Sequence, residues 1–207
     1  MEDRLNVILD LDNTLIVALE EHERDNLSRQ FQDKFAHKSM LAYGMKIFER
    51  PGLQSFLDYL FENFNVSVFT AAEQEYALFI INNFILIKPE RNIKYMFFRY
   101  HVEMAHKRYG GVKDLRLLFN VFNTPNCFPC NTIIIDDLPD VLETNPENTI
   151  PIKPFKIVND NGKVVTQAAN DKELERVKRV LQGLNLRFKQ SYFPRQIYLT
   201  QYPQSHP

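Results

Sequence analysis

The amino-acid sequence predicts an α/β fold in which helices cover both faces of a parallel β-sheet. Short apolar runs recur along the chain, and segments with the apolar spacing of an amphipathic helix lie between them. Strands that alternate with helices usually pair in parallel, because each helix carries the chain back to the start of the next strand. The alternation therefore favours an open, Rossmann-like sheet.

The expected strands are short and strongly apolar, as buried strands of parallel sheets are. The first is Leu5–Leu9, which leads directly into a carboxylate, Asp10. The remaining strands are expected at Val66–Phe69, Tyr95–Phe98, Thr132–Ile135 and Thr149–Ile152. Helical spacing appears in four segments, at Phe56–Phe61, Tyr76–Phe84, Leu115–Phe122 and Leu174–Leu184.

A small insertion, at about residues 16–48, separates the first strand from the first helix. Its charged middle part carries Leu27, Phe31 and Phe35 at helical spacing, which predicts a helical stretch with one apolar face. A short extended piece is expected to follow at residues 45–48. An insertion at this point of the chain can cover the end of the first strand, and its aromatic residues are candidates to line a substrate groove: Phe31, Phe35, Tyr43 and Phe48.

Length and composition fit one folded domain over residues 1–190. Residues 191–207, rich in Pro, Tyr and Gln, are expected to form an extended or partly disordered tail. The net charge of −1 gives no support for nucleic-acid binding, and no apolar run approaches the ~20 residues of a membrane span. Without a signal-peptide pattern and with two cysteines, the expected location is intracellular, in nucleus or cytoplasm.

Functional side chains follow the ends of several expected strands. In an open parallel sheet these ends meet at one edge, where ligands bind. Two of the strands end in carboxylates, which repel one another and are readily neutralised by a hard divalent cation with oxygen ligands. The residues that this topology brings to one edge are Asp10, Asp12, Thr70, Arg99, Asp136 and Asp137.

The same residues carry a family resemblance. Asp10–Thr14, read as Asp-Leu-Asp-Asn-Thr after an apolar strand, resembles the DxDxT motif of haloacid dehalogenase-like phosphatases. Other segments resemble the FCP/SCP (NIF-like) branch, which dephosphorylates the C-terminal domain (CTD) of RNA polymerase II. These segments occur in the family's order: Arg50–Gly52, Val68–Ala71, Phe98–Arg99, Val112–Leu115, Ile134–Asp137 and Asn148–Ile152.

The resemblance implies a role for each matching position. Asp10 resembles the nucleophile that forms an aspartyl phosphate, and Asp12 the general acid that then acts as a base. Thr70, Arg99 and Lys113 are implied to contact the substrate phosphate, and Lys113 also faces the nucleophile.

The implied cofactor is Mg²⁺. Its expected ligands come from Asp10, the backbone carbonyl of Asp12 and the pair Asp136 and Asp137. In this branch the second member of the pair tends to be the ligand, so the interpretation favours Asp137 and gives Asp136 an orienting role.

Structural alternatives exist for each of these residues. Asp10 and Asp12 can form a simple turn, Thr70 can cap the following helix, Lys113 can lie in a solvated basic loop, and Arg99 can make a surface ion pair. The Cys127–Cys130 segment, a CxxC pattern, is expected to be an ordinary loop. Its alternatives are a redox pair or a zinc site completed by two histidines, His101 and His106.

The resemblance implies a serine/threonine phosphatase whose partner is a phosphorylated peptide or protein, with the polymerase C-terminal domain as the favoured example. One alternative keeps the chemistry but acts on a small metabolite or a nucleic-acid 3′-phosphate. A second alternative is a non-catalytic binding module with the same fold. No membrane and no direct nucleic-acid contact is expected, and residues 16–48, which depart from the family's more extended sequence, are expected to set substrate preference.

Overall fold

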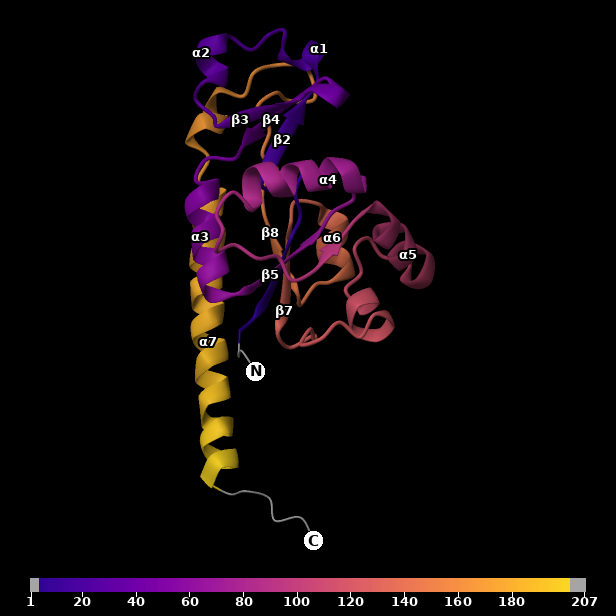
Figure 1. Ribbon diagram of the computed structural model, residues 1–207, viewed down its shortest axis with the longest axis vertical. Helices are drawn as coiled ribbons and strands as arrows, with labels where there is room; N and C mark the ends of the chain where they lie inside the picture. Colours follow the sequence, from indigo (N-terminus) through magenta and orange to yellow (C-terminus); the bar gives the residue numbers. More distant parts are fainter. Residues whose placement is uncertain (1–3, 202–207) are drawn as a thin grey trace.

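The computed structural model describes residues 4–201, with side chains described for residues 4–190. Its main sheet has five parallel strands in the order β6-β5-β1-β7-β8 (Figure 1). Their bounds agree with the prediction to within two residues: β1 Asn6–Leu9, β5 Asn65–Phe69, β6 Met96–Phe97, β7 Thr132–Asp136 and β8 Thr149–Pro151. The predicted α/β class with a parallel sheet is therefore confirmed.

Helices cover both faces of this sheet. Side chains of a strand point alternately to the two faces, so each face presents side chains against which helices pack. On β1, Val7 and Leu9 belong to a core shared with α3, α4 and α7, whereas Ile8 belongs to a core on the opposite face. Figure 1 shows α3 and α7 on one side and α5 and α6 on the other. The helix bounds are α3 Leu53–Asn63, α4 Gln74–Ile80, α5 Arg99–Tyr109, α6 Pro139–Thr144 and α7 Glu173–Gln201.

Two helices on the second face were not predicted. α5 has few apolar residues, so its sequence does not show the periodic stripe of an amphipathic helix. α6 is a single short helix that begins at Pro139, whose fixed φ suits a first helical position. The helix expected at Leu115–Phe122 is instead a π-helical turn, Leu117–Val121. None of the helices within residues 4–201 is long and apolar enough to span a membrane.

The insertion is a three-stranded antiparallel sheet, so the predicted helical stretch is wrong. β2 Ile16–Leu19 and β3 His37–Met40 both pair with β4 Met45–Glu49. The helical part is limited to two single turns, α1 Glu21–Arg24 and α2 Arg29–Gln32. The strands form because they pair with each other across the insertion. This pairing is a long-range effect, which the local spacing of Leu27, Phe31 and Phe35 does not reveal.

Aromatic residues of the insertion build its own core. Phe35 packs against Phe48 and against Phe155, which comes from the segment after β8. Phe31 is half-buried at the edge of the same cluster. In Figure 1 the orange segment after β8 lies beside the small sheet, so two distant parts of the chain complete this second core.

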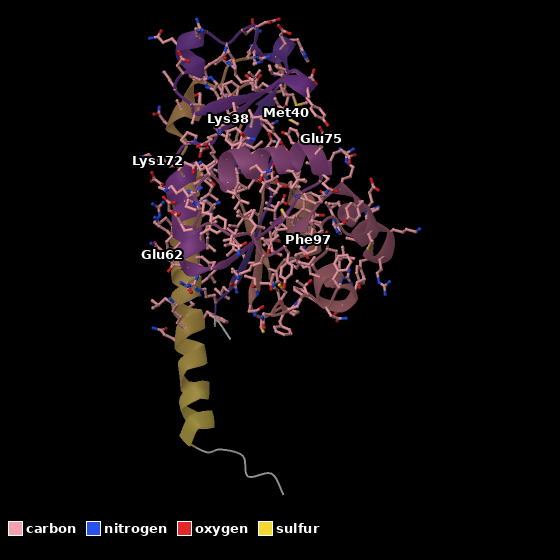
Figure 2. All side chains as sticks on the ribbon, in the orientation of Figure 1. Lys38, Met40, Glu62, Glu75, Phe97 and Lys172 are labelled. Carbon is pink, nitrogen blue, oxygen red and sulfur yellow. The ribbon has the colours of Figure 1, made fainter. Side chains whose placement is uncertain are left out.

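The small sheet is docked onto the main body. Met40 belongs to the main hydrophobic core, and Lys38 donates to the amide oxygen of Asn83, beyond α4, at 3.4 Å. Figure 2 shows both side chains on the side of the small sheet that faces α4. Buried Arg50 adds a further link, because its guanidinium bonds both carboxylate oxygens of Asp171 at 2.9 Å.

The C-terminal segment differs from the prediction. Residues 191–201, expected to be extended or partly disordered, continue α7 as helical backbone to Gln201. Extending an existing helix avoids the cost of nucleation, which favours helical backbone beyond residue 190. Residues 202–207 of the predicted tail lie outside the described residues.

Candidate active site

The carboxyl edge of the main sheet opens into a cavity of about 430 Å³. β1, β5 and β7 run in parallel and end side by side, which brings their following residues to this edge. The cavity is lined by six of the predicted site residues, Asp10, Asp12, Thr70, Arg99, Lys113 and Asp137. Asp136 lies beneath it and is completely buried.

A tight turn after β1 places Asp12 beside Asp10. Asn13 adopts a left-handed conformation at φ 57°, which Asn tolerates better than most residues, and the Leu15 amide donates to the Leu11 carbonyl at 2.8 Å. A turn was the structural alternative for this segment. The turn exists, and it also turns both carboxylates toward the cavity.

Lys113 lies between two carboxylates at the floor of the cavity. Its Nζ is 2.5 Å from Asp10 Oδ1 and 2.6 Å from Asp136 Oδ2, and only 1% of its surface is exposed. Burial lowers the pKa of Lys113, but the two carboxylates outweigh burial and raise the pKa above its usual value. The solvated-loop alternative is therefore wrong: Lys113 is a buried ammonium ion that holds Asp10 in place.

The carboxylates exceed the cations at this site. Oxygens of Asp10, Asp136 and Asp137 all lie within 4.8 Å of one another. Burial first, and then the charge of Asp10, raises the pKa of both Asp136 and Asp137. Three carboxylates face one lysine, so the cluster suits a divalent cation with oxygen ligands.

The two members of the acidic pair have different surroundings. Both oxygens of Asp136 are engaged, one by Lys113 and the other by the backbone amide of Leu138 at 3.0 Å. Asp137 lines the cavity and accepts one hydrogen bond, from the Thr14 hydroxyl at 3.2 Å. Within the described residues this aspartate cluster is the single group of three or more potential metal ligands, and the alternative zinc site at Cys127 is not formed.

Asp12 is held by a residue that sequence reasoning missed. The Tyr76 hydroxyl, on α4, donates to Asp12 Oδ1 at 2.6 Å. Burial raises the pKa of Asp12 to about 6, the hydrogen bond from Tyr76 lowers it, and Asp10 raises it. Burial and Asp12 also raise the pKa of Tyr76, which stays a neutral donor. The helical spacing of Tyr76 predicts a core residue. The signal for its further role is its hydroxyl, because a buried tyrosine hydroxyl usually needs a hydrogen-bond partner.

Thr70 and Arg99 also line the cavity. The Thr70 hydroxyl oxygen accepts from the Ala72 amide at 3.1 Å, which leaves its hydrogen free to donate. Thr70 is not the cap of α4, because the cap position belongs to Glu73. Arg99, at the first position of α5, makes the surface ion pair that was its structural alternative, with Glu73 at 2.9 Å, and both side chains are largely exposed.

The β3–β4 hairpin forms the outer wall. Tyr43 and Met45 line the cavity, and the Tyr43 hydroxyl donates to Glu75 on α4 at 3.0 Å. Of the four aromatic residues proposed to line a groove, only Tyr43 does so within the described structure. Phe48 is buried in the core of the insertion.

Comparison with known proteins identifies the family. A family model described as NLI interacting factor-like phosphatase matches residues 5–191. The chain belongs to this family. The NIF-like phosphatases form the FCP/SCP branch of the haloacid dehalogenase-like class, and the protein is therefore a phosphatase, as the resemblance implied.

Relatives of this NIF-like phosphatase occur in two invertebrate iridescent viruses. The CTD phosphatase-like protein 355R of invertebrate iridescent virus 6 is 40% identical over 183 residues, covering 85% of this chain and 96% of the viral protein. The protein of the same name from invertebrate iridescent virus 3 is 38% identical over 184 residues, with 85% and 94% covered.

Solved structures share the fold. Fcp1, described as an essential RNA polymerase II CTD phosphatase, matches with a TM-score of 0.67 at 19% identity, over 100% of this chain and 68% of its own. A fission yeast Fcp1 variant bound to beryllium fluoride matches with a TM-score of 0.69 at 19% identity, over 99% of this chain and 68% of its own. At this level of identity the likeness establishes the fold alone.

Proposed function

We propose that this protein is a Mg²⁺-dependent phosphatase that hydrolyses phosphoserine or phosphothreonine through an aspartyl phosphate on Asp10. The observation that carries the proposal is the placement of two carboxylates in one cavity, Asp10 fixed by Lys113 and Asp12 fixed by Tyr76. Two neighbouring carboxylates with different partners suit two roles, one nucleophilic and one in proton transfer.

The first step forms a bond between Asp10 and phosphorus. A carboxylate oxygen of Asp10 attacks the phosphoryl group, the bond from phosphorus to the leaving oxygen breaks, and Asp12 gives its proton to that oxygen. Burial favours this role, because it raises the pKa of Asp12 to about 6 and so helps the group to hold a proton. Lys113 and Arg99 line the same cavity and would offset the negative charge of the phosphoryl oxygens, to which the Thr70 hydroxyl would donate a hydrogen bond.

The second step releases phosphate. Asp12, now ionised, takes a proton from a water molecule whose oxygen attacks phosphorus, and the bond to Asp10 breaks. The same carboxyl group thus serves both steps and ends in its starting protonation state. Asp10 is returned as a carboxylate beside Lys113.

The acidic cluster fits Mg²⁺. We assign the ligands to Asp10, Asp137 and the backbone carbonyl of Asp12, since Asp137 faces the cavity whereas both oxygens of Asp136 are already bonded. Asp136 acts by orienting Lys113. When bound, Mg²⁺ supplies a Lewis acid for a phosphoryl oxygen and neutralises the surplus carboxylate charge.

The charges around the cavity favour a peptide over a polyanion. Arg99 is the one exposed cation among the described lining residues, and it is already paired with Glu73. A nucleic acid would bring further phosphates against Glu73 and Glu75 at the rim, whereas a peptide would not. Names of the viral relatives and of Fcp1 support the same substrate class, a phosphorylated polypeptide such as the polymerase C-terminal domain.

The test is a substrate panel of phosphopeptides, nucleotides and sugar phosphates, each with and without Mg²⁺. We expect Mg²⁺-dependent release of phosphate, with the highest kcat/KM on phosphoserine or phosphothreonine peptides. Undiminished activity in EDTA would remove the metal from the proposal. A nucleotide or sugar phosphate as the best substrate would remove the peptide and favour the metabolite alternative.

A further inference from the structure

We infer that Tyr76 is a positioning residue for the phosphatase reaction: its hydroxyl fixes the carboxyl group of Asp12 in the orientation that delivers a proton to the leaving oxygen. This inference rests on the proposed function, because it takes Asp12 as the general acid and base. It adds a residue from α4, an element that carries none of the other proposed functional groups.

The other carboxylates of the site have anchors of their own. Lys113 bonds Asp10 and Asp136 at 2.5 and 2.6 Å, and the Thr14 hydroxyl bonds Asp137 at 3.2 Å. None of these hydrogen bonds involves a residue of α4.

Asp12 has a single anchor among the described residues. Its side chain accepts one hydrogen bond, from Tyr76, and the length of 2.6 Å between the two oxygens is typical of a strong bond to a carboxylate. An acid that must meet the leaving oxygen within hydrogen-bonding distance loses efficiency when its carboxyl group rotates freely. The Tyr76 hydroxyl therefore supplies the constraint that the backbone of the turn does not.

The helix holds Tyr76 firmly enough to act in this way. Its neighbours Ala77 and Ile80 are completely buried in the main core, which fixes α4 against the sheet. The Tyr76 hydroxyl donates its hydrogen bond to Asp12 Oδ1, so Asp12 Oδ2 is the oxygen that remains to carry the proton. Tyr76 itself neither loses nor gains a proton in either step.

Two small substrates of similar size separate this role from a general effect on the fold. In p-nitrophenyl phosphate the leaving phenolate is stable without a proton, whereas in benzyl phosphate the leaving alkoxide requires one. The measurement is the ratio of kcat/KM for p-nitrophenyl phosphate to kcat/KM for benzyl phosphate, taken from release of the phenol or alcohol. For Tyr76→Phe we expect this ratio to rise about 10-fold, part of the ~10²–10⁴-fold that general acid catalysis contributes.

Tyr43→Phe is the matched control, because it removes a phenol from the same cavity whose partner is Glu75 instead of Asp12. The ratio should not change in Tyr43→Phe. Asp12→Asn should raise the ratio further than Tyr76→Phe does, and adding Tyr76→Phe to Asp12→Asn should have no additional effect.

The outcomes separate the two claims. An unchanged ratio in Tyr76→Phe, together with a raised ratio in Asp12→Asn, overturns the positioning role and leaves the proposed function intact. An equal rise in Tyr43→Phe also overturns it, because the effect then does not depend on contact with Asp12. An unchanged ratio in Asp12→Asn contradicts the acid assignment of the proposed function itself.

Discussion

Lys113 is a side chain whose position depends on burial and charge together. Moving an ammonium ion out of water costs several kcal/mol unless opposite charges compensate it, and here two carboxylates do so at hydrogen-bonding distance. In the proposed mechanism, the same contacts hold Asp10 Oδ1 and leave Oδ2 to attack the phosphoryl group. One buried cation would then contribute both to stability and to the geometry of the proposed nucleophile.

Asp10→Asn tests the proposed nucleophile by replacing one carboxylate oxygen with an amide nitrogen. In Asp10→Asn the amide is a poor nucleophile, so we expect kcat to fall on the order of 10³-fold or more. The variant should remain folded, since Lys113 keeps its contact with Asp136. Steady-state hydrolysis of p-nitrophenyl phosphate is the measurement, with circular dichroism as the folding control. A folded variant that retains substantial activity would contradict the assignment.

The two members of the acidic pair should respond differently to neutralisation. Asp137→Asn removes a proposed ligand and one repelling charge, so the Mg²⁺ concentration for half-maximal activity should rise at least ~10-fold while the metal-free Tm stays equal or rises. Asp136→Asn weakens the partner of buried Lys113, so its Tm should fall.

Activity titrated with Mg²⁺ and thermal unfolding in EDTA distinguish the pair. If Asp136→Asn had the larger effect on Mg²⁺ dependence and Asp137→Asn the lower Tm, the two assignments would have to be exchanged.

The site residues at strand ends could be predicted from the sequence. Tyr76, which donates a hydrogen bond to Asp12, could not. Asp10, Asp136 and Asp137 follow apolar runs, and parallel pairing dictates that such ends meet. Tyr76 occupies an apolar position of a helix, where spacing alone assigns it to the core. Its contact with Asp12 depends on how α4 docks against the sheet, which is a tertiary property.

Among the elements, the β3–β4 hairpin is the part of the insertion that reaches the site. Its strands pair through four residues each, and residues 41–44 connect them at the wall of the cavity. Leu41, in the connection, is 89% exposed. This hairpin is therefore the part of residues 16–48 that we expect to contact a peptide substrate.

Shortening the hairpin should alter selection without abolishing chemistry. Replacing residues 41–44 by Asn-Gly, which favours a two-residue turn, removes the wall and keeps the strand register. We expect kcat/KM for p-nitrophenyl phosphate to change less than about 3-fold, and the ratio of kcat/KM for two phosphopeptides to change about 10-fold.

A substitution far from the site provides the comparison. Leu186→Ser removes an exposed leucine from α7 and should leave the peptide ratio unchanged. If the shortened hairpin, shown to be folded, kept the same peptide ratio as the parent chain, selection would have to lie elsewhere, for example around Arg99.

The insertion also marks the limit of prediction at the level of elements. Strands of the main sheet are apolar enough to be found one at a time, because both of their faces are buried. Strand β3, His37–Met40, is mostly polar and exposed, and it forms only because β4 supplies its hydrogen bonds. A short polar strand of this kind has no local pattern that separates it from a loop or a helix.

At the scale of the whole molecule, Arg50 joins three parts of the chain. Its guanidinium, at the start of α3, bonds Asp171 and also donates to the backbone carbonyls of Thr14 and Lys153 at 2.9 and 2.7 Å. The turn that carries Asp12 and the segment that completes the second core are thereby tied to the main body. Sequence order gives no indication of the Arg50–Asp171 pair, because the two residues are 121 positions apart.

Breaking this link should lower the stability of the whole protein. Asp171→Asn leaves a buried guanidinium without its counter-charge, which we expect to cost up to about 3 kcal/mol, or up to roughly 6–12 °C in Tm for a chain of this size. Asp160→Asn is the matched control, because Asp160 pairs with Lys156 on the exposed surface. Equal Tm values for the two variants would contradict a structural role for the Arg50–Asp171 pair.

The most direct test of the proposed mechanism is to find which residue carries the phosphoryl group. Asp12→Asn should form the intermediate from p-nitrophenyl phosphate, whose leaving group needs no proton, but should hydrolyse it slowly. Acid quenching followed by borohydride reduction converts an aspartyl phosphate to homoserine, which peptide mass spectrometry locates in the sequence. The mechanism predicts homoserine at position 10, dependent on both substrate and Mg²⁺. Reduction at another residue, or a phosphoryl group that resists borohydride, would contradict it.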